Sequence, residues 1–130
     1  LTAIKVTFPG GILFPTNGTT LSATAQTELA QFAASLKENP NTNVQIYGFT
    51  DNTGTMAVNQ RVSTGRADSV LSFLAQCGIT PTRLSAQGVP MADYVATNDT
   101  PAGRAQNRRV EIYVSADQEM IKQAEAGTLK

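Results

Sequence analysis

One carboxylate and one guanidinium near the middle of the chain have types and positions suited to binding a small zwitterion. Asp51 lies in a turn that follows a short apolar strand, and Arg66 lies inside the helix expected after that turn. Asn59, Val62 and Arg66 are three, four or seven residues apart, so they share one helical face. A carboxylate can bind an ammonium group, and a guanidinium can bind a carboxylate through two parallel hydrogen bonds. The alternative is a structural salt bridge between Asp51 and Arg66 that ties the loop to the helix.

A second polar segment, residues 103–110, contains Arg104, Arg108 and Arg109. Three guanidiniums so close together could form a phosphate or carboxylate site. The alternative is that they lie at the solvated start of the last strand, where their side chains tie down nearby loops.

Composition excludes several classes of function. The chain has 130 residues, which is the size of one domain, and its 10 basic and 10 acidic residues cancel, so no broad charge attracts nucleic acid or anionic lipid. The absence of His removes the commonest general base and metal ligand. Residues 51–55 begin like a calcium loop but lack its glycine and closing glutamate. We therefore expect no catalysis, no cofactor and no metal.

Two observations concern the membrane and the start of the chain. No run of about 18 apolar residues is present, which predicts that nothing in this sequence spans a bilayer. The first residues have the pattern of a strand rather than a signal peptide, so we expect a mature or excised fragment.

The elements that must position these residues follow from periodicity and from turn residues. Ser22 is the expected N-cap of a helix that ends at Asn39-Pro40, and Gly78 is expected to end the next helix. We predict strands at residues 4–8, 44–47, 84–89 and 110–114 and helices at 22–38 and 58–76. The order predicts an α+β sandwich, a β-α-β-α-β-β mixed sheet with helices on one face. Residues 1–115 would form the domain and 116–130 a helical tail, while the long polar connection at 90–107 is expected to be functional or partly structured.

Two motifs follow each other along the chain. The first is Thr50-Asp51-Asn52-Thr53-Gly54, then Asn59, then Val62-Ser63-Thr64-Gly65-Arg66-Ala67, and the second is Gly103-Arg104-Ala105-Gln106-Asn107-Arg108-Arg109-Val110. These motifs resemble the signature and the closing motif of the OmpA-like C-terminal domain family. Residues 12–17 resemble the family's first strand and loop, and the similarity extends over about residues 4–114.

The resemblance implies a non-catalytic module that binds peptidoglycan non-covalently at the periplasmic face of the outer membrane or elsewhere in the cell envelope. It implies that Asp51 and Arg66 bind the diaminopimelate of the stem peptide, which carries an ammonium and a carboxylate on one side-chain carbon. It also implies that Asn17, Thr50, Asn59 and Val62 line the ligand site. Envelope proteins are possible partners.

Two positions depart from the family pattern. Phe49 stands where His is usual, and Pro15 stands where Asp is frequent. They favour an alternative in which the domain is a structural or protein-interaction module that has lost peptidoglycan binding. Gly65 lowers helix stability by about 1 kcal/mol relative to Ala, and one hypothesis is that it leaves room for the ligand.

Overall fold

Strands and helices alternate along the part of the chain that the computed structural model describes, residues 3–117. The elements are β1 (Ile4–Pro9), α1 (Gly10–Leu13), α2 (Ala23–Glu38), β2 (Thr42–Phe49), α3 (Met56–Gln76), the 3-10 helix η1 (Pro81–Arg83), β3 (Leu84–Val89), α4 (Pro101–Asn107) and β4 (Arg109–Ala116). None of the helices in this range is long and apolar enough to cross a membrane.

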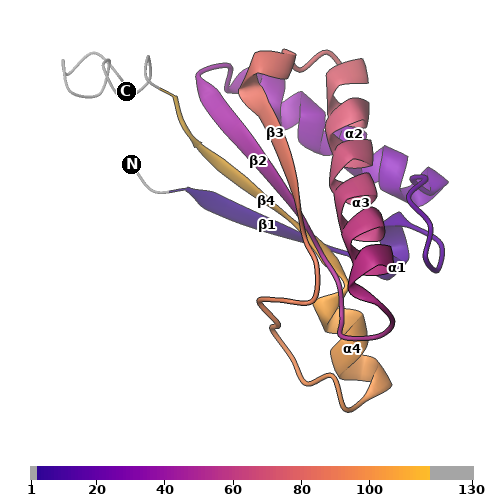
Figure 1. Cartoon of the computed structure of the whole chain (residues 1–130). Coiled ribbons are helices and arrows are strands. Elements are labelled where there is room, and N and C mark those ends of the chain that lie inside the picture. The colour runs from indigo at the N-terminus through magenta and orange to yellow at the C-terminus, as the bar shows by residue number, and fades with distance from the viewer. Residues whose placement is uncertain (1–2, 118–130) are drawn as a thin grey trace.

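The four strands form one mixed sheet in the order β1-β4-β2-β3. β2 and β3 are parallel, with Ile46 opposite Ala86, and α3 supplies the crossover that a parallel pair requires. β4 is antiparallel to both of its neighbours, with Ile112 opposite Val6 on one side and Ile46 on the other. Helices α2 and α3 cover the same face of the sheet (Figure 1). The predicted mixed sheet with helices on one face is confirmed.

The core fills the space between these helices and the sheet. Its fully buried members include Leu29 and Ala33 of α2, Val70 and Leu74 of α3, Val44 and Ile46 of β2, and Val110 and Ile112 of β4. The expected helix start is confirmed, because the Ser22 hydroxyl accepts a hydrogen bond from the N–H of Ala25 at 3.0 Å. The expected end of α3 is confirmed by the positive φ of 102° at Gly78.

Helix α3 approaches β2 very closely at Gly48. A Cβ atom at this position would lie 2.3 Å from the carbonyl oxygen of Ser63. Only glycine permits this contact, which holds the first half of α3 against the end of β2. The loop that leaves β2 and the buried face of α3 are therefore held next to each other.

Three segments differ from the expectations or extend them. Residues 10–13 form the helix α1 rather than part of a first strand: the N–H of Phe14 donates to the carbonyl oxygen of Gly10 at 2.9 Å, and this turn buries Leu13 while Ile12 stays exposed. The connection at 90–107 is partly structured, as expected, because it contains α4. The helical tail is predicted to begin at Ala116, but this residue is the last one of β4, and residues 118–130 of the predicted tail lie outside the described residues.

Candidate functional site

A groove of about 770 Å³ is lined by residues of the loop after β2 and of helix α4. That loop and α4 lie at the same end of the sheet (Figure 1). Its walls come from α1 and the loop after it, the loop after β2, the first half of α3, and the segment of α4 and Arg108. All six candidate residues named from the sequence line this one groove: Asn17, Thr50, Asp51, Asn59, Val62 and Arg66. Residues from four separate segments of the chain thus meet in one concave surface.

Asp51 is buried in the loop after β2 and is 5% exposed. Its Oδ1 accepts a hydrogen bond from the N–H of Thr53 at 2.8 Å, and its Oδ2 accepts one from Nη1 of Arg108. Burial by itself raises the pKa of this carboxyl, but the two hydrogen bonds and the charge of Arg108 outweigh it and hold the pKa below its ordinary value. Asp51 is therefore a carboxylate throughout the neutral range.

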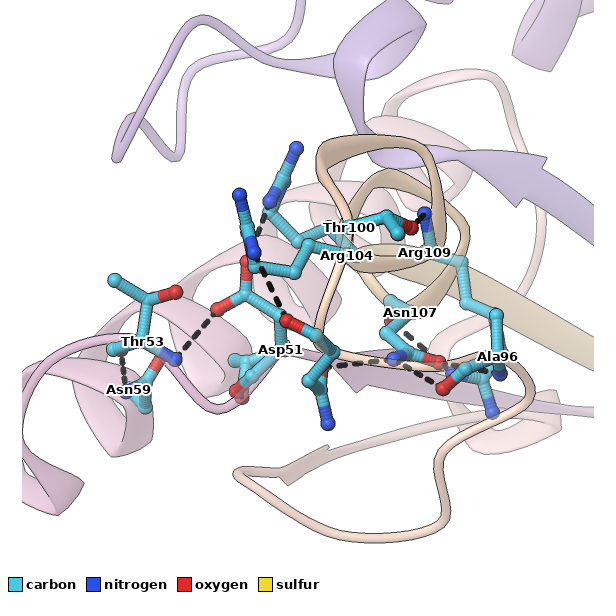
Figure 2. A network of polar contacts seen from close by, with 12 residues as sticks. Asp51, Thr53, Asn59, Ala96, Thr100, Arg104, Asn107 and Arg109 are labelled. Atoms are coloured by element: carbon cyan, nitrogen blue, oxygen red, sulfur yellow. Dashed lines mark hydrogen bonds and ion pairs between the residues drawn. The ribbon is translucent and has the colours of Figure 1, made fainter.

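Two predicted site residues fix the shape of this loop. The Asn59 amide donates to the carbonyl oxygen of Thr53 at 2.7 Å (Figure 2). It also donates to the carbonyl oxygen of Thr55 at 2.9 Å. The Thr50 hydroxyl donates to the carbonyl oxygen of Asp51 at 2.9 Å and accepts from the N–H of Met91 at 2.8 Å. These bonds set the position from which Asp51 presents its carboxylate.

Arg66 is 6% exposed, yet among the described residues no carboxylate forms an ion pair with it. Its Nε donates to the carbonyl oxygen of Gly18 at 2.9 Å and its Nη2 donates to that of Pro15 at 3.2 Å. The guanidinium carbon lies 4.9 Å from the centre of the Phe14 ring. Burial, and next the charge of Arg108, lower the pKa of Arg66. The contacts fix the orientation of the guanidinium and leave its charge without an anion.

The expected alternative of a salt bridge between Asp51 and Arg66 is wrong for the described residues, because Asp51 pairs with Arg108 instead. The groove still brings the two predicted residues together, since both line it. Asp51 and Arg66 are therefore not ion-pair partners, but both line the same groove.

The other candidate positions play different parts. Asn17 is exposed in the loop after α1 with a φ of 55°, and Val62 is buried as an apolar part of the wall. Gly65 does not line the groove, and a Cβ at that position would meet Cγ2 of Thr19 at 2.8 Å. The space beside Gly65 therefore holds the loop residue Thr19, which corrects the expectation that it serves a ligand.

Of the two departures from the family pattern, only one faces the groove. Pro15 lines it and supplies a carbonyl acceptor to Arg66. Phe49 does not line it: its ring is 3.9 Å from the guanidinium carbon of Arg109. The side chain at position 49 is therefore not part of the groove wall.

The three arginines of the closing motif divide between the two roles considered from the sequence. Arg104 and Arg108 line the groove, whereas Arg109 is buried in an ion pair with Glu111, with 2.6 Å between Nε and Oε2. Arg109 also donates to the carbonyl oxygens of Asn107 and Asp93 (3.0 and 2.9 Å). These contacts are structural, and only Arg104 and Arg108 of the three line this groove.

One residue that the sequence analysis did not single out organises this region. The fully buried Asn107 accepts hydrogen bonds from the N–H groups of Val95 and Ala96 at 2.8 and 3.0 Å, and it donates to the carbonyl oxygen of Ala96 and to Oδ1 of Asn98, both at 2.9 Å (Figure 2). It thereby holds the preceding loop against α4. Its place in the closing motif, beside Arg108, was the available signal.

The described residues contain no group of three or more side chains of the kinds that commonly hold a metal ion. What the groove offers is one carboxylate, Asp51, and three guanidiniums, on Arg66, Arg104 and Arg108. Such a set can bind an ammonium group at one point and carboxylates at others.

Comparison with known proteins shows similarity to the OmpA family. The model of the OmpA family matches residues 13–108. The probable lipoprotein YiaD of Escherichia coli is 41% identical over 112 residues, which are 86% of this chain and 51% of YiaD. The peptidoglycan-binding protein ArfA of Mycobacterium tuberculosis is 37% identical over 113 residues, 87% of this chain and 35% of ArfA. The chain thus spans about half or less of these two relatives.

Among solved structures, the cell wall anchor of the T6SS from Pseudomonas aeruginosa superposes with a TM-score of 0.80 and 33% identity. That match covers 89% of this chain and 83% of the other.

Proposed function

Because this chain belongs to the OmpA family, we propose that it binds peptidoglycan non-covalently in the groove and anchors an envelope structure to the cell wall. The observation that carries the proposal is the buried, oriented guanidinium of Arg66, which has no carboxylate partner among the described residues and faces the same cavity as Asp51. A buried charge without a counter-ion is costly. A carboxylate from a ligand would supply the missing partner.

The ligand chemistry that fits is an amino-acid zwitterion, such as the side chain of diaminopimelate in a stem peptide. Arg66 would bind the carboxylate with the donors that Gly18 and Pro15 leave unused. Asp51 would bind the ammonium: a carboxylate has about four acceptor positions, and the described contacts use one from Thr53 and one from Arg108.

The relatives support this reading. ArfA is named as a peptidoglycan-binding protein, and the similar structure from Pseudomonas aeruginosa is described as a cell wall anchor. YiaD is named as a probable lipoprotein. A location in the cell envelope, at the periplasmic face of the outer membrane, would place this chain where peptidoglycan is within reach.

The same groove gives no support to wall hydrolysis. Glycosidases commonly use a pair of carboxylates, and Asp51 is the only carboxylate among the described residues that line the groove. The chain also lacks His. Binding without turnover is therefore the function proposed.

Affinity for one stem peptide should be modest, since a small ligand makes few contacts. Many copies of the domain on one surface would strengthen attachment through effective concentration.

The test is co-sedimentation of the folded protein with purified peptidoglycan. Asp51→Ala and Arg66→Ala should each lose most of the bound fraction. Asp68→Ala and Arg61→Ala are matched controls, because both residues are exposed on α3 and neither lines the groove. If the folded wild type stays in the supernatant, the proposal is wrong and the domain is better described as a structural or protein-interaction module.

A further inference from the structure

The charges that line the groove do not balance. Its described walls carry the guanidiniums of Arg66, Arg104 and Arg108 against the single carboxylate of Asp51. A zwitterion has no net charge, so its binding would leave this excess of positive charge in place. The excess is what a second anionic group on the ligand would neutralise.

Two of these arginines form a pair on one side of α4. Arg104 and Arg108 are four residues apart, and the N–H of Arg108 donates to the carbonyl oxygen of Arg104 at 3.1 Å, so their side chains leave the backbone in similar directions. Each guanidinium has five N–H donors. The described contacts use one donor of Arg104, to the carbonyl oxygen of Asn98 at 2.9 Å, and one of Arg108, to Asp51. Most of the donors of both residues therefore stay available to a ligand.

The excess positive charge affects the pKa of Arg66. Its pKa is lowered first by burial and then by the positive charge of Arg108, so these two guanidiniums repel each other across the groove. The side chain of Arg108 is 42% exposed and can adjust its position, whereas Arg66 is held by two backbone carbonyl groups. An anion bound beside Arg108 and Arg104 would reduce this repulsion.

We propose that Arg104 and Arg108 form a second carboxylate subsite, which makes the groove select stem peptides that carry a free carboxylate in addition to the zwitterion. The subsite rests on the proposed binding of peptidoglycan in this groove. It assigns Arg66 and Asp51 to the zwitterion, and it assigns the two arginines at the end of α4 to a carboxylate elsewhere on the peptide. Amidation of that carboxylate would then weaken binding.

The experiment uses two synthetic soluble stem peptides that contain the same diaminopimelate zwitterion. In one peptide every other carboxylate is free, and in the other all of these carboxylates are amidated. Isothermal titration calorimetry of the wild type should give an affinity about ten-fold higher for the peptide with free carboxylates than for the amidated peptide. This difference is expected for one added charge-assisted contact.

The variant Arg104→Gln should bring this ratio close to one, because the loss of this guanidinium weakens binding of the free peptide more than binding of the amidated one. Arg104 is preferred to Arg108 for this test because it makes no described contact with Asp51. Arg61→Gln removes the same charge from an exposed position outside the groove and should keep the wild-type ratio.

The outcomes distinguish a failure of the second carboxylate subsite from a failure of peptidoglycan binding itself. Equal affinity of the wild type for both peptides would overturn the second subsite and leave peptidoglycan binding intact. An unchanged ratio in folded Arg104→Gln would also overturn it. If neither peptide binds and the protein also fails to sediment with peptidoglycan, both proposals are wrong.

Discussion

Arg108 and Asp51 form an ion pair between positions that are 57 residues apart in the chain. The pair joins the loop after β2 to the residue that follows α4, and both of its members line the groove. Its two members differ in exposure, with 42% for the side chain of Arg108 and 7% for that of Asp51. The carboxylate is therefore fixed and the guanidinium is the adjustable partner.

The variant Arg108→Gln should raise the pKa of Asp51. The hydrogen bond and the charge of Arg108 both lower this pKa, while burial, which raises it, would remain. An NMR titration of the Asp51 side-chain carboxyl carbon measures the shift, and Arg61→Gln serves as the control. An unchanged midpoint in Arg108→Gln would show that the ion pair does not form in solution.

The variant Arg66→Lys should weaken peptidoglycan binding by about ten-fold or more under the proposed function. An ammonium cannot reproduce the planar set of donors that contacts Gly18 and Pro15 and would at the same time bind a ligand carboxylate. Titration with the free stem peptide measures the change. Arg61→Lys should bind like the wild type. Equal binding by Arg66→Lys would mean that only positive charge is needed at this position.

The variant Glu111→Gln should lower the free energy of unfolding by about 3 kcal/mol at neutral pH, since it leaves the guanidinium of Arg109 buried without its counter-ion. Urea unfolding of the wild type and the variant gives the difference. A change below about 1 kcal/mol would contradict the importance of the pair and would match a surface ion pair instead.

The difference in free energy of unfolding between the wild type and Glu111→Gln should become smaller at acidic pH. Burial raises the pKa of Glu111, but the hydrogen bonds from Arg109 and Tyr113 and the nearby positive charges outweigh burial and lower it. A group with a lowered pKa in the folded state stabilises fully above its unfolded pKa, about 4.3 for glutamate, and loses this contribution as the pH falls through the folded pKa. The stability gap between wild type and Glu111→Gln should therefore be largest at neutral pH and narrow as the pH falls below the ordinary pKa of glutamate. A gap that stays constant would exclude this origin.

The variant Gly48→Ala should destabilise the domain by about 2 kcal/mol or more, because its Cβ would collide with the backbone of Ser63 and force α3 away from β2. Thermal or urea unfolding measures this loss. Gly11→Ala is the matched control: a Cβ at position 11 meets nothing within 4 Å, so stability should be equal or slightly higher. Similar losses in the two variants would contradict the role assigned to the close approach.

Much of the fold followed from local signals in the sequence. The alternation of apolar residues predicted β3 and β4, and Ser22 and Gly78 marked the start of α2 and the end of α3 where the structure has them. Such signals are readable because side-chain direction and capping depend on residues a few positions apart. The sequence did not predict the short helix α1, since four residues give too little periodicity. Its backbone contact with Arg108 is also distant in sequence.

For the site, the sequence by itself determined which side chains share a face of α3, because helical spacing alone places Asn59, Val62 and Arg66 together. Only the tertiary structure decided that Asp51 pairs with Arg108. The physical reason is that the pairing of two distant residues depends on which segments lie together in the folded chain. A contact between positions 57 residues apart produces no periodic pattern in the sequence.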